Sequence, residues 1–154
     1  MDIRFEQITY DNIKAVVGLY DTLTDQQKKA VAPNVNSLAE AYLNYNIAWP
    51  RAIYDQDKLI GFLMLGLDNF IADEKDWPVY FLWRFMIAQP YQNQGYGKKI
   101  IDKVISKCRR EGINHLYVSC DRSVDMPYAF YIKYGFIDTG RVEDDETILK
   151  IKVS

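Results

Sequence analysis

The sequence predicts a mixed α/β fold, in which a central twisted sheet of six to seven strands is flanked by helices. The first observation is the run 79–88, which is apolar at nine of its ten positions and predicts a strand buried on both faces. The second is the helical spacing of apolar residues over 97–108, followed by another β-rich run over 113–120. A strand, a helix and a strand in that order require a right-handed parallel crossover. We therefore expect one domain spanning residues 1–154.

Composition supports a globular protein and argues against several classes. A chain of 154 residues can bury a core without a disulfide or a metal staple. Hydrophobic residues make up 49% and charged residues 26%, which is ordinary for a soluble globule. The net charge of −2 argues against a nucleic-acid binder, because such proteins carry a strongly basic face.

The sequence contains no visible targeting or metal-binding pattern. The first residues lack a basic segment followed by an apolar one, so we expect no signal peptide. No apolar run approaches the ~20 residues that a membrane helix needs, so we expect no membrane association. Cys108 and Cys120 have neither metal-ligand spacing nor a disulfide framework, which predicts no metal and a reducing, cytoplasmic location.

The first third of the chain predicts one strand and three helical pieces. Residues 2–8 alternate polar and apolar, as a half-buried strand does, and 11–20 can form a short helix. The segment that follows predicts two helical pieces separated at Pro33. Ser37 and Glu40 have the spacing of a capping box, which predicts that the second piece begins at Ser37.

The middle of the chain predicts a hairpin and then the central strand. Residues 51–55 and 58–67 are β-rich runs separated by the turn residues Gln56 and Asp57. A polar loop over 72–78 then leads to the apolar run described above.

The predicted helix over 97–108 is amphipathic and has a clear end. Its apolar residues recur at helical spacing and predict a buried face formed by Ile100, Ile101, Val104, Ile105 and Cys108. Gly112 lies just past its end, where a left-handed cap is common. A second helix is predicted over 125–134 and closed by Gly135, and strands near 136–141 and 147–152 complete the sheet.

The loop before the first of these helices has the composition of an anion site. Residues 89–99 read QPYQNQGYGKK and join the central strand directly to a helix. A helix start offers unpaired N–H groups, and glycines such as Gly95 and Gly97 let the backbone approach a phosphate closely. Asn93 tolerates left-handed geometry, and Lys98 adds positive charge. The alternative is an ordinary strand-to-helix turn, since short glycine patterns are weak evidence alone.

A second motif, PYAFYIKYGF at 127–136, lies in the later helix. Together the two segments resemble the Gcn5-related N-acetyltransferase (GNAT) superfamily, whose acetyl-CoA loop has the form Gln/Arg-x-x-Gly-x-Gly/Ala. That loop pattern is matched by Gln92, Gly95 and Gly97. The family's later pattern, close to Leu/Phe-Tyr-x-x-x-Gly-Phe, is matched by Phe130, Tyr131, Gly135 and Phe136.

The resemblance is strongest to one group within the superfamily. The stretches VAPNVNSLAEAY, WPRAIYD, GFLML and LWRFMIAQPYQNQGYGKK are similar to bacterial spermine/spermidine N-acetyltransferases. The chain departs from many relatives at Asn93, where they have glycine. This resemblance implies transfer of acetyl from acetyl-CoA to a primary amine, with a polyamine as the favoured acceptor.

The resemblance also implies roles for individual residues. The CoA pyrophosphate would be held by the loop residues Gln92, Asn93, Gln94, Gly95, Tyr96, Gly97 and Lys98. The strand backbone at Phe85, Met86 and Ile87 would align the pantetheine arm, and an N–H there would polarise the thioester carbonyl. Tyr131 would be the general acid that protonates, or hydrogen-bonds to, the departing thiolate.

The base that removes the amine proton is less well indicated. Glu40 is one candidate, although its predicted capping role explains it without catalysis. The acidic loop residues are a second possibility, either as attractors of a cationic amine or as a solvated loop: Asp68, Asp73, Glu74 and Asp76. A chain of water molecules is a third.

The remaining functional residue types suggest direct transfer. His115 is expected to be a structural or surface residue, and not a ligand or a base. Cys120 has no partner that would make it a nucleophile, so we expect direct attack in a ternary complex. Arg84 interrupts a buried strand and needs a partner. Trp49, Trp77 and Trp83 could contact a polyamine through cation–π interactions, and the alternative is that most of them belong to the core. A homodimer is expected because relatives often form one.

The alternatives to a polyamine acceptor are an aminoglycoside, another small amine or a protein amino group. The alternative to an enzyme is a catalytically idle acyl-CoA-binding module.

Overall fold

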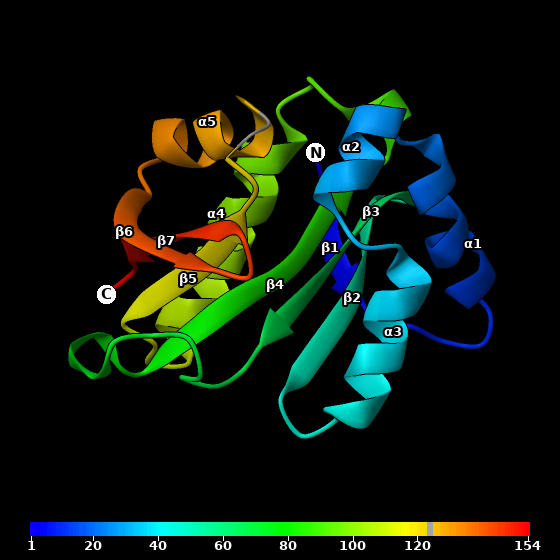
Figure 1. Cartoon of the computed structure of the whole chain (residues 1–154). Coiled ribbons are helices and arrows are strands. Elements are labelled where there is room, and N and C mark those ends of the chain that lie inside the picture. The colour runs from blue at the N-terminus through cyan, green and yellow to red at the C-terminus, as the bar shows by residue number, and fades with distance from the viewer. Residues whose placement is uncertain (123–124) are drawn as a thin grey trace.

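The computed structural model describes residues 1–122 and 125–154 and contains one seven-stranded sheet with the strand order β1-β2-β3-β4-β5-β7-β6 (Figure 1). The strands are β1 Ile3–Glu6, β2 Ala48–Asp55, β3 Lys58–Gly66, β4 Val79–Ile87, β5 His115–Cys120, β6 Ile137–Glu143 and β7 Glu146–Lys152. The helices are α1 Ile13–Gly18, α2 Asp25–Ala30, α3 Asn34–Leu43, α4 Tyr96–Arg110 and α5 Asp125–Tyr134. Short 3₁₀ helices lie at Leu19–Thr22, Glu74–Asp76 and Gln89–Tyr91. The predicted α/β class is confirmed.

The sheet is mixed because one of its strand pairs is parallel. β4 and β5 run parallel and are joined through α4, as the sequence predicted, whereas the other neighbouring pairs are antiparallel. The predicted hairpin turn between β2 and β3 is also present, with Gln56 in left-handed geometry.

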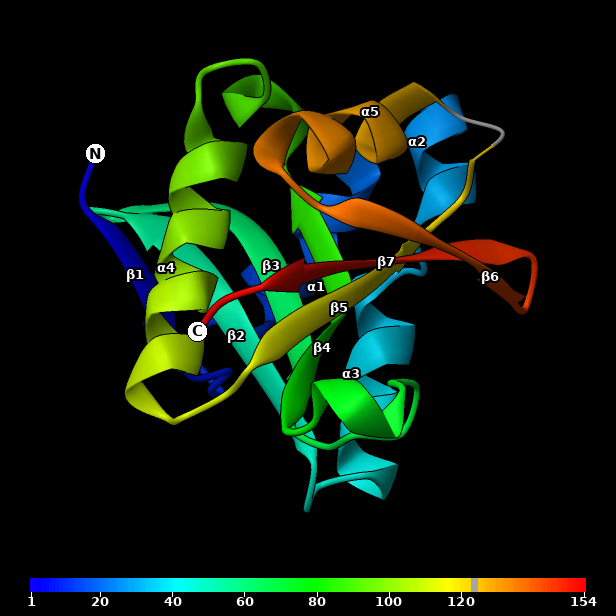
Figure 2. The same ribbon diagram turned by 90° about the vertical axis from the view of Figure 1, so that its left-hand side faces the viewer.

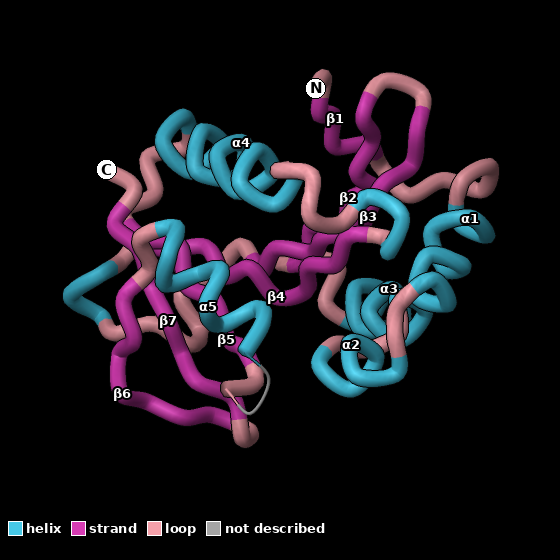
Figure 3. The backbone as a smooth tube through the Cα atoms, turned by 90° about the horizontal axis from the view of Figure 1, so that it is seen from above, coloured by secondary structure: helices cyan, strands magenta, loops and turns pink. Residues whose placement is uncertain are grey.

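Helices cover both faces of the sheet. Figure 3 shows α4 and α5 on one face and α1 and α3 on the other, and Figure 2 shows α4 lying across its face in front of the strands. The buried stripe of α4 contains each of the five apolar residues predicted from the spacing. Gly112, just beyond α4, has the predicted left-handed conformation with φ of 74°. On the opposite face, Val16 of α1 and Ala41 of α3 pack with Phe62 and Met64 of β3.

The predicted capping box at Ser37 and Glu40 is wrong. α3 already begins at Asn34, directly after Pro33, so both residues lie inside the helix. Ser37 is fully buried, and its hydroxyl has no hydrogen-bond partner in the described part of the chain. Proline can occupy a helix start without losing a hydrogen bond, which explains why α3 starts before the polar pair. A capping box does exist one helix earlier, where Thr24 and Gln27 cap α2.

The prediction that β4 is buried on both faces is correct for only part of the strand. Val79, Leu82 and Met86 are buried, but Trp83 and Phe85 are only half-buried. Tyr80 and Phe81 are half-buried although β4 still pairs with β5 there, whereas Trp83 and Phe85 lie beyond the end of that pairing, where the strand lines a cavity.

A buried polar cluster joins the loop before β4 to strands β5 and β7. The Asp76 carboxylate accepts hydrogen bonds from Lys150 Nζ at 2.7 Å and from the Tyr117 hydroxyl. His115 lies beside it, with Nε2 3.6 Å from Asp76 Oδ1. Burial alone would raise the pKa of Asp76, but the hydrogen bonds from Lys150 and Tyr117 outweigh it and hold that pKa below its usual value. Asp76 is therefore an anchoring residue.

Replacing Asp76 with asparagine is expected to lower the free energy of unfolding by about 2–3 kcal/mol, because Lys150 would remain buried without a counter-charge. The stabilisation is present above the unfolded carboxylate pKa of about 4 and is lost as pH falls through the lower folded value. Urea unfolding of both proteins at several pH values measures this effect. The exposed Asp73→Asn serves as control, and equal losses in the two variants would contradict the account.

Candidate active site

The loop between β4 and α4 presents the start of a long helix without a side-chain cap. Gly95 is the N-cap residue of α4 in left-handed geometry, with φ of 86°, and no side chain of the described residues caps the helix start. Asn93 is also left-handed, with φ of 60°, as its residue type suggested. The N–H groups of the first turn have no partner within the helix, so they are available to an anion.

The amide side chains of the loop fix its shape. Gln92 Nε2 donates to the Ile87 carbonyl at 2.8 Å, and Gln27 of α2 donates to Gln92 Oε1 at 2.7 Å. Gln94 Nε2 donates to the Pro90 carbonyl at 2.8 Å. These side chains bond back to the protein, so the loop can offer its backbone to a ligand.

Gly97 has a packing role that the sequence did not indicate. A Cβ at this position would lie 3.1 Å from the ring of Phe130, so the glycine allows α4 and α5 to approach closely. Because Phe130 precedes Tyr131, this contact ties the loop to the second motif.

Gly97→Ala is expected to lower the free energy of unfolding by about 1–2 kcal/mol, since the Phe130 ring must shift. It should also weaken, several-fold, the CoA binding that the family resemblance implies for this loop. Replacing the Phe130 ring with a smaller side chain, in the double variant Gly97→Ala/Phe130→Leu, should restore part of the lost stability and part of the lost CoA affinity. Thermal unfolding and CoA titration measure the two quantities. Gly18→Ala is the control, because a Cβ there meets nothing within 4 Å. A Gly97→Ala protein with unchanged CoA affinity would contradict this reading.

β4 and β5 separate just before the loop. Their pairing ends at Leu82 and Val118, although β4 continues to Ile87. The backbone of Phe85, Met86 and Ile87 is paired with β3 on one edge only. The opposite edge has no strand partner among the described residues. Its Ile87 carbonyl accepts the hydrogen bond from Gln92, and the remaining backbone groups of that edge can pair with an extended ligand in the manner of an added strand.

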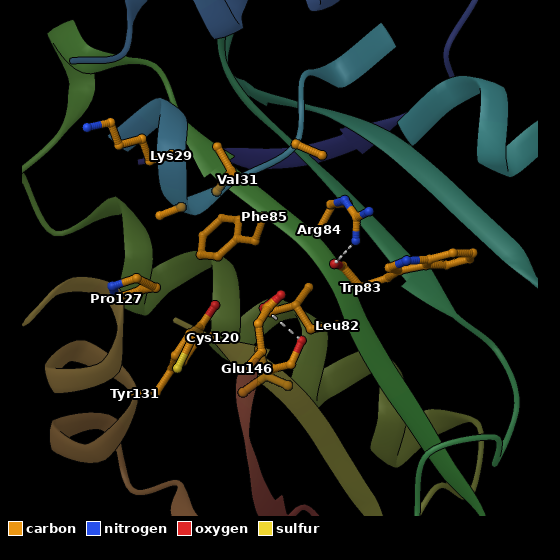
Figure 4. A pocket seen from close by; sticks show the side chains of 14 residues that line it. Lys29, Val31, Leu82, Trp83, Arg84, Phe85, Cys120, Pro127, Tyr131 and Glu146 are labelled. Carbon is orange, nitrogen blue, oxygen red and sulfur yellow. Dashed lines mark hydrogen bonds between the residues drawn. The ribbon is translucent and has the colours of Figure 1, made fainter. Parts of the chain in front are cut away.

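Two hollows meet at this separation. We call the first the loop groove; it has a volume of about 650 Å³ and runs from the β4–α4 loop along the end of β4. We call the second the inner cavity; it has a volume of about 320 Å³ and lies between β4, β5, α2 and α5 (Figure 4). The residues that line both are Ala30, Val31, Phe85, Pro127 and Tyr131.

Tyr131 lies where the loop groove and the inner cavity meet. Its side chain is buried, and its ring packs edge-to-face against Phe130 and Phe136. Its hydroxyl has no hydrogen-bond partner among residues 1–122 and 125–154. Burial raises the pKa of Tyr131 well above that of an ordinary phenol, so it keeps its proton at neutral pH. A protonated hydroxyl without a partner can serve a reacting group.

Glu40 pairs with Arg84 and lies outside both hollows. The Arg84 Nη2 atom is 3.4 Å from the Glu40 carboxylate, and Nη1 donates to the Trp83 carbonyl at 3.0 Å. The partner that Arg84 required is therefore a residue 44 positions away on α3. The four acidic residues of the loop between β3 and β4 do not line either hollow.

The tryptophans differ in their access to the site. Trp83 lines the inner cavity, whereas Trp49 is already contacted by two cations of the protein. Arg51 lies 4.0 Å and Lys107 lies 4.3 Å from the centre of its ring.

One residue of the inner cavity was not anticipated from the sequence. Glu146, at the start of β7, lines this cavity and accepts a hydrogen bond from Ser119 Oγ at 3.1 Å. Its burial raises its pKa. In the sequence it belongs to the acidic turn EDDE, which has the composition of a solvated hairpin tip.

Comparison with known proteins identifies the family. Residues 18–136 match the description "Acetyltransferase (GNAT) family", which covers most of the chain. The chain belongs to the GNAT family. It is accordingly an acetyl-CoA-dependent acetyltransferase, as the two motifs indicated.

Two kinds of relative accompany this GNAT assignment. A spermine/spermidine N(1)-acetyltransferase of Bacillus subtilis is 27% identical over 150 residues, which cover 93% of each chain. Among solved structures, an acetyltransferase of Thermus thermophilus has a TM-score of 0.80 at 12% identity and covers 99% of this chain and 97% of its own. The PaiA N-acetyltransferase of Thermoplasma acidophilum, in complex with coenzyme A, has a TM-score of 0.69 at 15% identity and covers 99% of both chains. The two structures show the GNAT fold.

The described residues of this GNAT protein contain neither a membrane-spanning helix nor a metal-binding cluster. None of its helices combines the length and apolar character required to span a bilayer. Its histidine, cysteine and acidic side chains do not gather in groups of three or more that could hold a metal ion.

Proposed function

We propose that this enzyme transfers the acetyl group of acetyl-CoA to a primary amine of a polyamine such as spermidine or spermine. The observation that carries the proposal is the meeting of the loop groove and the inner cavity at Phe85 and Tyr131. Two substrates that enter from opposite sides would meet there.

The loop groove suits the donor. The uncapped start of α4, with left-handed Gly95 and the neighbouring Lys98, would receive the diphosphate of CoA. The free edge of β4 over Phe85–Ile87 would pair with the amide groups of the pantetheine arm. An N–H of that stretch would hydrogen-bond to the thioester carbonyl and stabilise the developing oxyanion, an effect worth about 3 kcal/mol.

The inner cavity suits a slender cationic acceptor. Its walls include the apolar side chains of Val31, Leu82 and Phe85, which can pack against methylene groups. Glu146 supplies negative charge for an ammonium, and the charge of Arg84 is offset by Glu40 outside the cavity. The spermine/spermidine N(1)-acetyltransferase of Bacillus subtilis adds support for a polyamine.

Direct attack in a ternary complex is the route that we propose. Burial raises the pKa of the Cys120 thiol to about 11, so this cysteine of the inner cavity is poorly suited to act as a nucleophile. The deprotonated amine would attack the thioester carbon, and the C–S bond would break as the thiolate receives a proton or hydrogen bond from Tyr131. The amine must first lose a proton, so activity should rise into mildly alkaline pH.

A panel of amines tests the proposal. CoA thiol release from acetyl-CoA is measured with spermidine, spermine, an aminoglycoside and a lysine-containing peptide. We expect the highest kcat/KM for the polyamines. Faster turnover of another acceptor would overturn the polyamine assignment, and CoA binding without turnover of any amine would indicate a sensor module.

A further inference from the structure

The inner cavity contains one acidic side chain that has no catalytic role in the proposed function. Among the described residues that line this cavity, Glu146 is the only carboxylate. It projects from the first position of β7, where the neighbouring Thr147 is in register with Cys120 of β5. This register brings a residue of the EDDE turn beneath the separated ends of β4 and β5.

Glu146 is held in a defined orientation. Ser119 Oγ donates to its Oε1 atom at 3.1 Å, which engages one of the two carboxylate oxygens. Figure 4 shows the carboxylate pointing into the space between Tyr131 and Arg84. The second oxygen, Oε2, has no hydrogen bond to any residue that the structure describes, so it can accept one from a molecule in the cavity.

The surroundings of Glu146 make it a better proton acceptor than a surface glutamate. Burial is the main cause of its raised pKa, and Asp121 and Asp144 add to the increase. The hydrogen bond from Ser119 on β5 and the charge of Arg84 on β4 act in the opposite direction. Lys29 of α2 also lines the cavity. Tyr131 on α5 and Cys120 on β5 are both neutral at physiological pH, because burial raises both of their pKa values.

We propose that Glu146 is the catalytic residue that accepts the proton which the acceptor ammonium must lose before its nitrogen attacks acetyl-CoA. This inference rests on the proposed function, because it requires a primary amine in the inner cavity. The three required features lie together there: a free carboxylate oxygen, the general acid Tyr131 and the backbone of Phe85.

The protons balance over one turnover. The ammonium R–NH3⁺ transfers one proton to the Glu146 carboxylate, and the resulting carboxylic acid later releases it to water. The free amine forms the new C–N bond. As the C–S bond breaks, the thiolate takes the Tyr131 proton, and the second proton lost from the nitrogen replaces it on Tyr131. The net products are the amide, CoA thiol and one proton.

The test is the pH dependence of Glu146→Gln, which keeps the shape of the side chain and its contact with Ser119. At neutral pH we expect kcat/KM for spermidine to fall about 100-fold, because a general base typically contributes at least that factor. Near pH ~10 a large part of the amine is already deprotonated in solution, so the deficit should shrink to less than about 10-fold. CoA affinity and the unfolding midpoint should remain those of the wild type.

The matched control is Glu143→Gln. Glu143 faces Glu146 across the same hairpin but pairs with Arg141 and lies outside the cavity, so its removal should not change the pH profile. A deficit of Glu146→Gln that is equal at all pH values would indicate a structural role and overturn the inference, as would wild-type activity. In either case the wild type still acetylates an amine and the proposed function stands. If the wild type acetylates no amine, the proposed function and the inference both fail.

Discussion

Replacing Tyr131 with phenylalanine is expected to lower kcat by about 10²- to 10⁴-fold, because the departing thiolate loses its proton donor. CoA affinity should remain unchanged, since the ring still packs between Phe130 and Phe136 and only the hydroxyl is removed. Thiol-release kinetics and CoA titration measure the two quantities separately. Retention of full turnover by this variant over a range of pH would remove Tyr131 from the mechanism.

The matched control for this experiment lies one turn further along α5. Tyr134 donates its hydroxyl to Asp102 on α4 and lines neither hollow, so Tyr134→Phe should alter stability but not turnover. A similar loss of kcat in both variants would show that the effect comes from displacement of α5.

The environment of Tyr131 also determines the alkaline side of the pH profile. Because burial raises its pKa well above the ordinary phenol value, Tyr131 should stay protonated up to pH ~10. Activity of the wild type should therefore rise with amine deprotonation and show no fall below that pH. A descending limb between pH ~8 and ~9 that disappears in Tyr131→Phe would contradict the assignment of a neutral hydroxyl.

Replacing Gly95 with aspartate should weaken binding far more than it lowers stability. A Cβ here meets only the end of Met1 at 3.8 Å, but the φ of 86° strains any residue that has a Cβ, and aspartate tolerates this geometry better than most. The free energy of unfolding should therefore fall by only about 1 kcal/mol. The new carboxylate would repel the CoA diphosphate at the start of α4, and we expect a loss of CoA affinity of about 100-fold or more.

Gly95→Asn provides the uncharged comparison. Asparagine has almost the same shape as aspartate and the same tolerance of left-handed geometry, but it carries no charge. The Gly95→Asn protein should therefore lose less than about 10-fold in CoA affinity. Calorimetric titration at two salt concentrations measures both variants, and the difference between them should shrink at high salt. Equal affinity for CoA in the two variants would show that no anionic group binds at this loop.

The sequence predicted the elements whose pattern is local. The buried stripe of α4 and the turn at Gln56 depend on residue spacing over a few turns, and both are present. The capping box failed because two polar positions with the correct spacing can equally lie inside a helix, and Pro33 starts α3 earlier.

The site was less predictable because its contacts join distant parts of the chain. The pairing of Arg84 with Glu40 spans 44 residues, and the contact between Gly97 and Phe130 depends on how α4 and α5 cross. Glu146 reaches the inner cavity only because β7 inserts between β5 and β6 in a particular register. A single sequence does not encode such a register in any local pattern, so the acidic turn gave no indication of it.

The central claim is that acetyl-CoA and a primary amine bind together and react at the junction marked by Tyr131. The most direct measurement is the initial rate of CoA thiol release with acetyl-CoA and spermidine both varied. The account predicts saturation by both substrates and reciprocal plots that intersect, as expected for a ternary complex. Parallel plots would indicate a covalent acetyl-enzyme and contradict direct attack, and the absence of amine-dependent thiol release would contradict transfer to this acceptor.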